Sequence, residues 1–340
     1  MEAKLSFVPY SERYSEAHRV FALKNWKGKR RRYEESYIRW KFRGPMQGEM
    51  ESCLLALENE AVVGQVGLIP VDIRIGEQSL KAQWVCDLMV DRAAQGKWIG
   101  SKILKAAIAR NQVSLGSDPS KAADVVMSRI GFRPIKGPKK LIMPVKLNHL
   151  LSWRIPEKFK FAIPLLAQLC RPIIFWRSRG LRWHRGQNGV KRLPWQEVAP
   201  LIEQHQKKST SPHVVHDFDF LQWRCSGLEG FAAKIYAIAT NAGSYAILEE
   251  GGPYLYVQDW FVPHREDFIP LYQEILQVAI EAGSQTIQTL AQDEQETEML
   301  LNVGFLVRRH DVKIICYPPH MLIPTWDKFL YCLYDSDGNL

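Results

Sequence analysis

The sequence predicts an α/β (α+β) protein of two tandem domains, each a mixed, mostly antiparallel sheet flanked by helices. Three observations lead to this prediction. The length of 340 residues is sufficient for two cores of ordinary size. The first half contains a helix, a series of strand-like runs, and then alternating helices and strands. The second half repeats short motifs of the first half in the same order.

Local patterns predict the elements of the first half. Apolar residues at helical spacing predict a helix over 11–24. Strand-like runs joined by turn residues predict an antiparallel meander over 53–58, 62–69, 71–75 and 80–90. The rest of the pattern predicts a helix over 99–111, a strand near 113–115, a helix over 120–129 and a last strand over 140–145.

Three motifs of the first half recur in the second. They pair 37–42 (YIRWKF) with 220–225 (FLQWRC), 87–90 (DLMV) with 259–262 (DWFV), and 130–132 (IGF) with 303–305 (VGF). From Asp87 to Gly131 there are 44 positions, and from Asp259 to Gly304 there are 45. We therefore predict a duplicated domain with a diverged second copy. We place the N-terminal domain at 1–147, a helical linker at 148–190 and the C-terminal domain at 191–340.

The linker contains an apolar segment at 159–176. Pro164 and Pro172 interrupt it, and it is too short to span a bilayer. We expect a packed helical hairpin there. Two alternatives are a lid over an acyl chain and an element on a membrane surface. The basic residues that flank it are Lys158, Lys160, Arg177 and Arg179.

The net charge of +9 suits an anionic partner. Nucleotide phosphates, an acidic carrier protein, nucleic acid and a membrane surface all meet this condition. The densest basic run, 27–32 (KGKRRR), is either a solvated loop or an electrostatic funnel for an anionic substrate. None of the six cysteines has CxxC or zinc-finger spacing, so we expect reduced thiols and no metal. The N-terminus lacks the pattern of a secretory signal, and we expect a cytoplasmic location.

The segment 85–104 contains the strongest chemical signal. A strand ends near Val90, a loop with small residues follows over 95–100, and a helix begins there. Glycines let the backbone approach a ligand closely. The first amides of a helix lack internal partners and lie at the positive end of its dipole. The pattern therefore predicts a pyrophosphate site, to which Lys97 adds charge.

This strand, loop and helix resemble motif A of the Gcn5-related N-acetyltransferases (GNAT), whose loop reads Gln/Arg-x-x-Gly-x-Gly/Ala. Gln95 and Gly100 match the first and last positions, and Gly96 matches a common variant, but Trp98 stands where the family has Gly. The helix after Ser120 and its Gly-Phe turn are also similar to the family. The resemblance covers 5–145 well and 191–318 weakly.

The resemblance implies an acyl-thioester donor, acetyl-CoA or a longer acyl-CoA. Leu88, Met89 and Val90 would bind the pantetheine arm and polarise the thioester carbonyl. The pyrophosphate would be held by Gln95, Gly96, Lys97, Trp98, Ile99, Gly100 and Ser101. In the second half, the residues after Val262 (PHREDFIP) form no such loop. We therefore expect the C-terminal copy not to bind coenzyme A in this way.

Asp87 is the candidate general base, because an amine with a pKa near 10.4 must lose a proton before it attacks. The alternative is a structural Asp, which Asp259 at the matching position favours. The family's usual acid, a Tyr four residues before the Gly-Phe turn, is Met127 here. Another group or water must then protonate the leaving thiolate.

Two further sets of residues have the chemistry of a site. His213 and His216 are spaced to share a helical face, but no third metal ligand is evident, so a loop or a cap before the element at 220–224 is expected. Three tryptophans could line a pocket for a long acyl chain: Trp40, Trp84 and Trp98.

We therefore expect an N-acyltransferase that moves an acetyl or longer fatty acyl group to a primary amine. Its donor is acyl-CoA or an acidic acyl carrier protein. The acceptor is a small molecule or a peptide, including a Lys or ornithine side chain of a peptide natural product. One alternative is an aminoacyl-tRNA-dependent transferase of the FemAB type. Such enzymes lack a coenzyme A loop, whereas this chain keeps most of one, so a nucleic-acid partner is not expected. The other is an acyl-CoA-binding module without catalysis.

Overall fold

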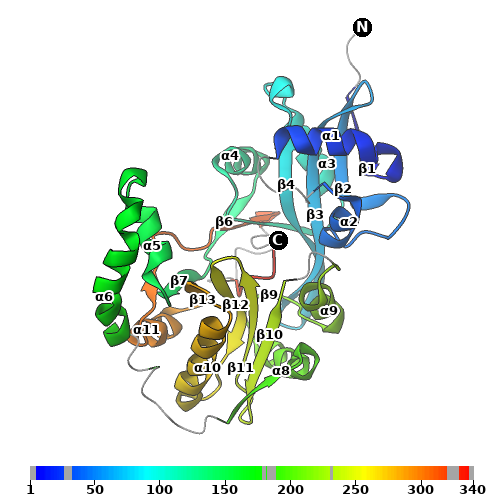
Figure 1. The fold of residues 1–340 in the computed structure, drawn as a ribbon. Helices are drawn as coiled ribbons and strands as arrows, with labels where there is room; N and C mark the ends of the chain where they lie inside the picture. Colours follow the sequence, from blue (N-terminus) through cyan, green and yellow to red (C-terminus); the bar gives the residue numbers. More distant parts are fainter. Residues whose placement is uncertain are drawn as a thin grey trace.

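A computed structural model describes residues 5–26, 33–177, 181, 189–229, 233–319 and 329–336. Its strands form two mixed sheets with helices on their faces, as the sequence predicts (Figure 1). The basic run 27–32 lies outside the described residues. Within them, no helix has the length and apolar content that a membrane span requires.

The first half follows the predicted order closely. Its elements are β1 (Leu5–Tyr10), α1 (Ser15–Asn25), α2 (Glu35–Lys41), β2 (Met50–Glu58), β3 (Ala61–Ile75), β4 (Gln78–Val90), α3 (Ile99–Ile108), β5 (Val113–Ser117), α4 (Lys121–Ile130), β6 (Arg133–Ile135) and β7 (Lys139–Pro144). The predicted break near Pro70 is absent, and β3 is continuous. Pro70 pairs with Gln83 of β4, but the pairing of β3 with β2 already ends at Gly67. The missing N–H of Pro70 therefore costs no hydrogen bond to β2.

The second half repeats this order after a helical insert. The insert consists of α5 (Leu147–Arg154), the 3₁₀ segment η3 (Glu157–Ala162) and α6 (Ile163–Arg177). The repeat comprises β8 (Val190–Leu193), α8 (Trp195–Lys208), β9 (His213–Val214), α9 (Phe218–Ser226), β10 (Ile235–Thr240), β11 (Tyr245–Gly251), β12 (Tyr254–Phe261), α10 (Phe268–Glu281), β13 (Thr286–Ala291), α11 (Glu294–Asn302), β14 (Leu306–Val307) and β15 (Ile314–Tyr317).

The two halves exchange one strand each. The first sheet has the order β1-β2-β3-β4-β5-β15-β6, and the second has β8-β10-β11-β12-β13-β7-β14. The strand expected to close the first half, β7, therefore lies in the second sheet, and β15 takes its place in the first. Local pattern predicts that β7 is a strand but not which strand it pairs with. The connection from β6 to β7 meets the connection from β14 to β15 at Gly137 and Val312. A Cβ on Gly137 would lie 2.1 Å from the carbonyl oxygen of Val312, so glycine is required there.

Two equivalent tryptophans mark the contact between the halves. The Trp40 indole N–H donates to the carbonyl of Trp223 at 3.3 Å, and the Trp223 indole N–H donates to the carbonyl of Trp40 at 2.8 Å. A reciprocal contact between equivalent residues is the mark of a two-fold axis. The duplicated elements are thus related by an approximate two-fold axis that passes between α2 and α9.

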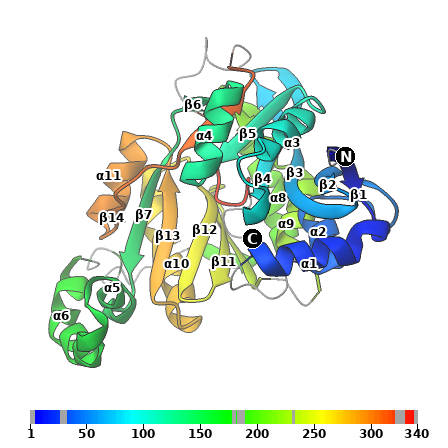
Figure 2. The same ribbon diagram turned by 90° about the horizontal axis from the view of Figure 1, so that it is seen from above.

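The last described segment, 329–336, lies at the junction of the two sheets, near the C label in Figures 1 and 2. Phe329 and Tyr331 pack against Trp84, with ring centroids 6.2 and 5.6 Å away. One hydrophobic core contains these side chains together with Leu55 of the first sheet and Ile247 of the second. Trp84 is therefore a core residue and is almost fully buried.

His213 of β9 gives the fold a pH dependence. Its side chain is buried, and burial lowers the pKa of its imidazole to about 4. The unfolded chain protonates it near 6.5. Since the unfolded state then binds more protons, stability should fall as pH falls from about 6.5 to about 4, by about 2 kcal/mol at pH 5. Denaturant unfolding at pH 7 and pH 5 measures this loss.

The matched variant for this prediction is His213→Gln. We expect it to lose less stability than the wild type between pH 7 and pH 5. Burial also lowers the pKa of His18 and His205, so a part of the slope should remain. An equal loss in both proteins would contradict the assignment.

Candidate active site

The site forms where β4 and β5 separate. These parallel strands pair only from Ala82 to Trp84, although β4 continues to Val90. Among the described residues, no strand pairs with the β5-facing edge of β4 beyond Trp84. A bulge widens this gap, because Val66 of β3 stands opposite both Asp87 and Leu88. Asp87 has a left-handed backbone there, with a φ of 48°.

A cavity of about 560 Å³ lies at the mouth of this gap, against the N-terminus of α3. Nine of the ten residues predicted to bind the donor line it: Leu88, Met89, Val90, Gln95, Gly96, Trp98, Ile99, Gly100 and Ser101. The tenth, Lys97, pairs instead with Glu58 at 2.8 Å and does not line the cavity. Its predicted contribution to the site therefore has no support from the geometry.

The cavity is suited to an anion. The first-turn amides of α3 lack helical partners, and that turn contains no acidic residue. Arg92 and Arg129, which the sequence analysis did not single out, also line the cavity. The only sequence signal for Arg129 is its position just before the Gly-Phe turn. Two cations and a helix N-terminus together provide a site for a phosphate or pyrophosphate.

Trp98 occupies a backbone position that favours glycine. It is the N-cap of α3 with a φ of 61°, in the left-handed region. This geometry explains why the resembling loops have glycine there, and a Trp in it costs about 1–2 kcal/mol. The residue is 63% exposed at the cavity, and the Arg129 guanidinium lies 5.7 Å from the centroid of its ring. Of the three tryptophans considered, only Trp98 lines the cavity.

A smaller hollow of about 230 Å³ continues inward and shares Leu88, Ser120 and Ala123 with the cavity. Asp87 and Met127 line it. Met127, at the position of the family's tyrosine, therefore presents a thioether to this space. The hollow is the part of the gap closest to the bulge of β4.

Asp87 forms a buried ion pair that the sequence did not reveal. The Lys41 ammonium of α2 donates to its Oδ2 at 2.6 Å, and both side chains are almost fully buried. The Cys53 thiol lies beside the pair, and burial raises its pKa. The sequence contains one sign that Lys41 matters: it lies in the repeated motif, where the second half has another basic residue, Arg224, at the equivalent position. The pair gives Asp87 a structural contact beside any role as a base.

The second half contains an equivalent gap, which the chain itself fills. β12 and β13 pair only from Tyr254 to Tyr256, and a bulge lies beside Asp259. Segment 329–336 enters this gap. The Leu333 N–H donates to the carbonyl of Gln258 at 2.9 Å, and the Tyr334 hydroxyl donates to Asp259 at 2.9 Å. This filling is a physical reason to expect no donor site there.

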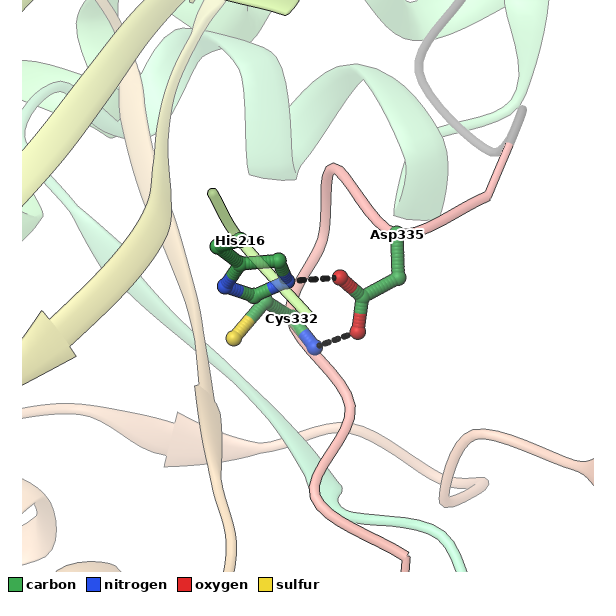
Figure 3. Close-up of side chains that lie close together, drawn as sticks. All are labelled: His216, Cys332 and Asp335. Carbon is green, nitrogen blue, oxygen red and sulfur yellow. Dashed lines mark hydrogen bonds and ion pairs between the residues drawn. The ribbon is translucent and has the colours of Figure 1, made fainter. Parts of the chain in front are cut away.

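The same segment surrounds His216 with polar groups (Figure 3). Asp335 Oδ1 lies 2.5 Å from His216 Nε2, and the Cys332 N–H donates to Asp335 Oδ2 at 2.8 Å. The atoms of His216, Cys332 and Asp335 that could ligate a metal ion lie within 4.8 Å of one another. No local pattern links these residues to His216, because Cys332 and Asp335 are more than a hundred positions away. The loop or cap predicted before 220–224 is a helix cap at Asp217, whose carboxylate accepts from the Phe220 N–H at 2.8 Å.

Comparisons with known proteins agree with this geometry. Residues 15–113 match the family model described as an acetyltransferase (GNAT) domain. No curated protein matches the chain. A GCN5-related N-acetyltransferase from Kribbella flavida is similar over 92% of this chain and 71% of its own, with 12% identity and a TM-score of 0.60. N-myristoyltransferase from Saccharomyces cerevisiae with bound myristoyl-CoA is similar over 93% and 79%, with 10% identity and a TM-score of 0.60.

A GCN5-related N-acetyltransferase from Anabaena variabilis is similar over 92% of this chain and 72% of its own, with 8% identity and a TM-score of 0.62. The chain has the GNAT fold. These likenesses span both sheets, whereas the family model matches only part of the first half. At these identities the likenesses establish the fold alone.

Proposed function

We propose that the protein is an N-acyltransferase that transfers an acyl group from an acyl thioester to a primary amine. One observation supports this most strongly. The cavity combines a helix N-terminus, two arginines and the edge of a bulged strand that has separated from β5 in one place. The first two parts suit the phosphates of coenzyme A, and the strand edge suits the amides of a pantetheine arm.

The reaction joins the acceptor nitrogen to the acyl carbon and breaks the carbon–sulfur bond. The amine must lose a proton, and the thiolate that leaves must gain one. The hollow lined by Asp87 and Ser117 lies next to the donor cavity, where the amine would approach the thioester carbonyl. We keep Asp87 as the candidate base. Backbone N–H groups at the bulge would polarise the carbonyl as it gains negative charge.

The donor we favour is acyl-CoA, either acetyl-CoA or a longer acyl-CoA. The donor cavity of about 560 Å³ includes the apolar residues Leu88, Met89 and Val126 in its lining and is compatible with either acyl length. An acidic acyl carrier protein is a variant of the same donor chemistry. The acceptor class we propose is a primary amine of a small molecule or a peptide.

Intact-mass measurement of a mixture of amine acceptors tests the proposal. The protein is incubated with acetyl-CoA or with a long-chain acyl-CoA, and release of free thiol is followed in parallel. We expect an acceptor to gain the mass of the acyl group with one of the donors. Binding of the thioester without turnover would instead favour a module that has lost catalysis. If the protein neither binds nor turns over any of the thioesters, the proposal is wrong.

A further inference from the structure

The helical insert has an exposed apolar surface. Five large apolar side chains are exposed within eleven residues of η3 and α6: Phe159, Phe161, Leu165, Leu166 and Leu169. We call these five residues the insert face. Phe161 is 82% exposed and Leu169 is 67% exposed. Other exposed apolar side chains of the described chain are scattered, so this concentration marks an interaction surface.

The solvent side of α6 differs from that of an ordinary surface helix. Its exposed residues are Pro164, Leu165, Leu166, Gln168, Leu169 and Pro172, with no charge among those whose side chains are described. The exposed residues of α8, in contrast, are Gln196, Glu197, Pro200, Glu203, Gln204, Lys207 and Lys208. A helix that faces water normally presents charged and polar residues. The exposed side of α6 is therefore suited to an apolar environment.

Positive charge is concentrated around the same segment. Residues 154–185 contain eight Lys or Arg and one Glu, a net charge of +7 against +9 for the whole chain. Lys158 is exposed, and its ammonium lies 5.1 Å from the ring centroid of Phe159. Apolar side chains beside a strong positive charge fit the boundary between acyl chains and anionic headgroups. A folded protein partner would not require both features at this density.

The insert also stands where a flat surface could reach it. In both views α6 forms the outer edge of the molecule, with α5 between it and β7 (Figures 1 and 2). Its 15 residues extend about 22 Å, which is too short to span a bilayer and suits a helix lying in its surface. None of its residues lines the donor cavity, so it does not act as a lid there.

We propose that the insert face docks the protein on a membrane that contains anionic phospholipid. Phe159, Phe161 and the exposed leucines of α6 enter the interface between headgroups and acyl chains. Lys158 and Lys160, beside this face, attract the anionic headgroups. This inference is independent of acyl transfer, and its test needs no thioester.

Co-sedimentation with vesicles tests the proposal on the full chain. One vesicle preparation is phosphatidylcholine alone, and the other also contains phosphatidylglycerol. We expect binding to the anionic vesicles to be at least about tenfold stronger. The triple variant Phe161→Ser/Leu165→Ser/Leu169→Ser should lower that binding at least about tenfold, since it removes most of the inserted apolar area.

The matched control is Val20→Ser/Leu23→Ser, which removes exposed apolar side chains from α1. It should bind vesicles like the wild type. The variant Lys158→Gln/Lys160→Gln should weaken binding to anionic vesicles and leave the circular dichroism spectrum unchanged. Absence of binding to either vesicle, or equal binding by the triple variant, would overturn the proposal. So would a wild-type dimer that binds no vesicles and that the triple variant converts to a monomer, because a second copy would then cover the face.

Discussion

Replacing Lys41 by Ala should destabilise the protein by about 3–5 kcal/mol. The substitution leaves the Asp87 carboxylate buried, without the ammonium that donates to it at 2.6 Å. An isolated buried charge costs far more than a solvated one, because water no longer compensates it. The free energy of unfolding from denaturant titration measures the effect.

The chain offers a matched control for this prediction. Lys81 forms an ion pair with Asp72 at 2.8 Å, but the two side chains are 76% and 35% exposed. Lys81→Ala should therefore cost less than about 1 kcal/mol. A loss in Lys41→Ala no larger than that of the control would contradict the account of the buried pair.

A double variant separates the two roles of Asp87. Lys41→Met together with Asp87→Leu replaces both charges by apolar groups, and it should recover most of the stability lost in Lys41→Ala. If Asp87 is also the general base, this folded variant should lose about 10²–10⁴-fold in kcat. Full turnover in the double variant would leave Asp87 as a structural residue.

The second large effect is expected at Ser101. Ser101→Glu places a carboxylate in the first turn of α3, at the wall of the cavity. It should weaken binding of a coenzyme A thioester by about tenfold to a hundredfold, because it repels the pyrophosphate at a cost of about 1–3 kcal/mol. The same charge should stabilise the helix by about 0.3–1 kcal/mol, since it faces the positive end of the dipole. Calorimetric titration and thermal unfolding together show both changes.

Ser101→Glu should weaken binding and raise stability, and this combination makes the test specific. A variant that merely damaged the fold would lose stability and affinity together. Lys102→Gln lowers the net charge by the same unit on an exposed side chain that does not line the cavity. It should bind the thioester within about twofold of the wild type, because exposed charges are screened by salt. If Ser101→Glu and Lys102→Gln bind the thioester with equal affinity, the phosphates do not bind at the first turn of α3.

The sequence predicted features that depend on neighbours along the chain. The strand, loop and helix of 85–104, the cap at Asp217 and the repeated motifs are all local patterns, and the structure contains each of them. Nine residues predicted for the donor site meet at one cavity for the same reason, since they lie within fourteen positions of one another.

Features that depend on distant partners escaped prediction. Lys41 and Asp87 are 46 positions apart, and His216 and Asp335 are 119 apart. The exchange of β7 and β15 leaves no mark on either strand, because strand propensity does not specify a partner. The filling of the second gap by 329–336 was also missed, although it explains why one donor site is expected.

The protein should have one thioester site, at the N-terminus of α3. Calorimetric titration of the protein with a non-hydrolysable acyl-CoA analogue measures the number of sites. We expect one bound analogue per chain and loss of that binding in Ser101→Glu. Two bound analogues per chain, or binding that Ser101→Glu leaves intact, would contradict it.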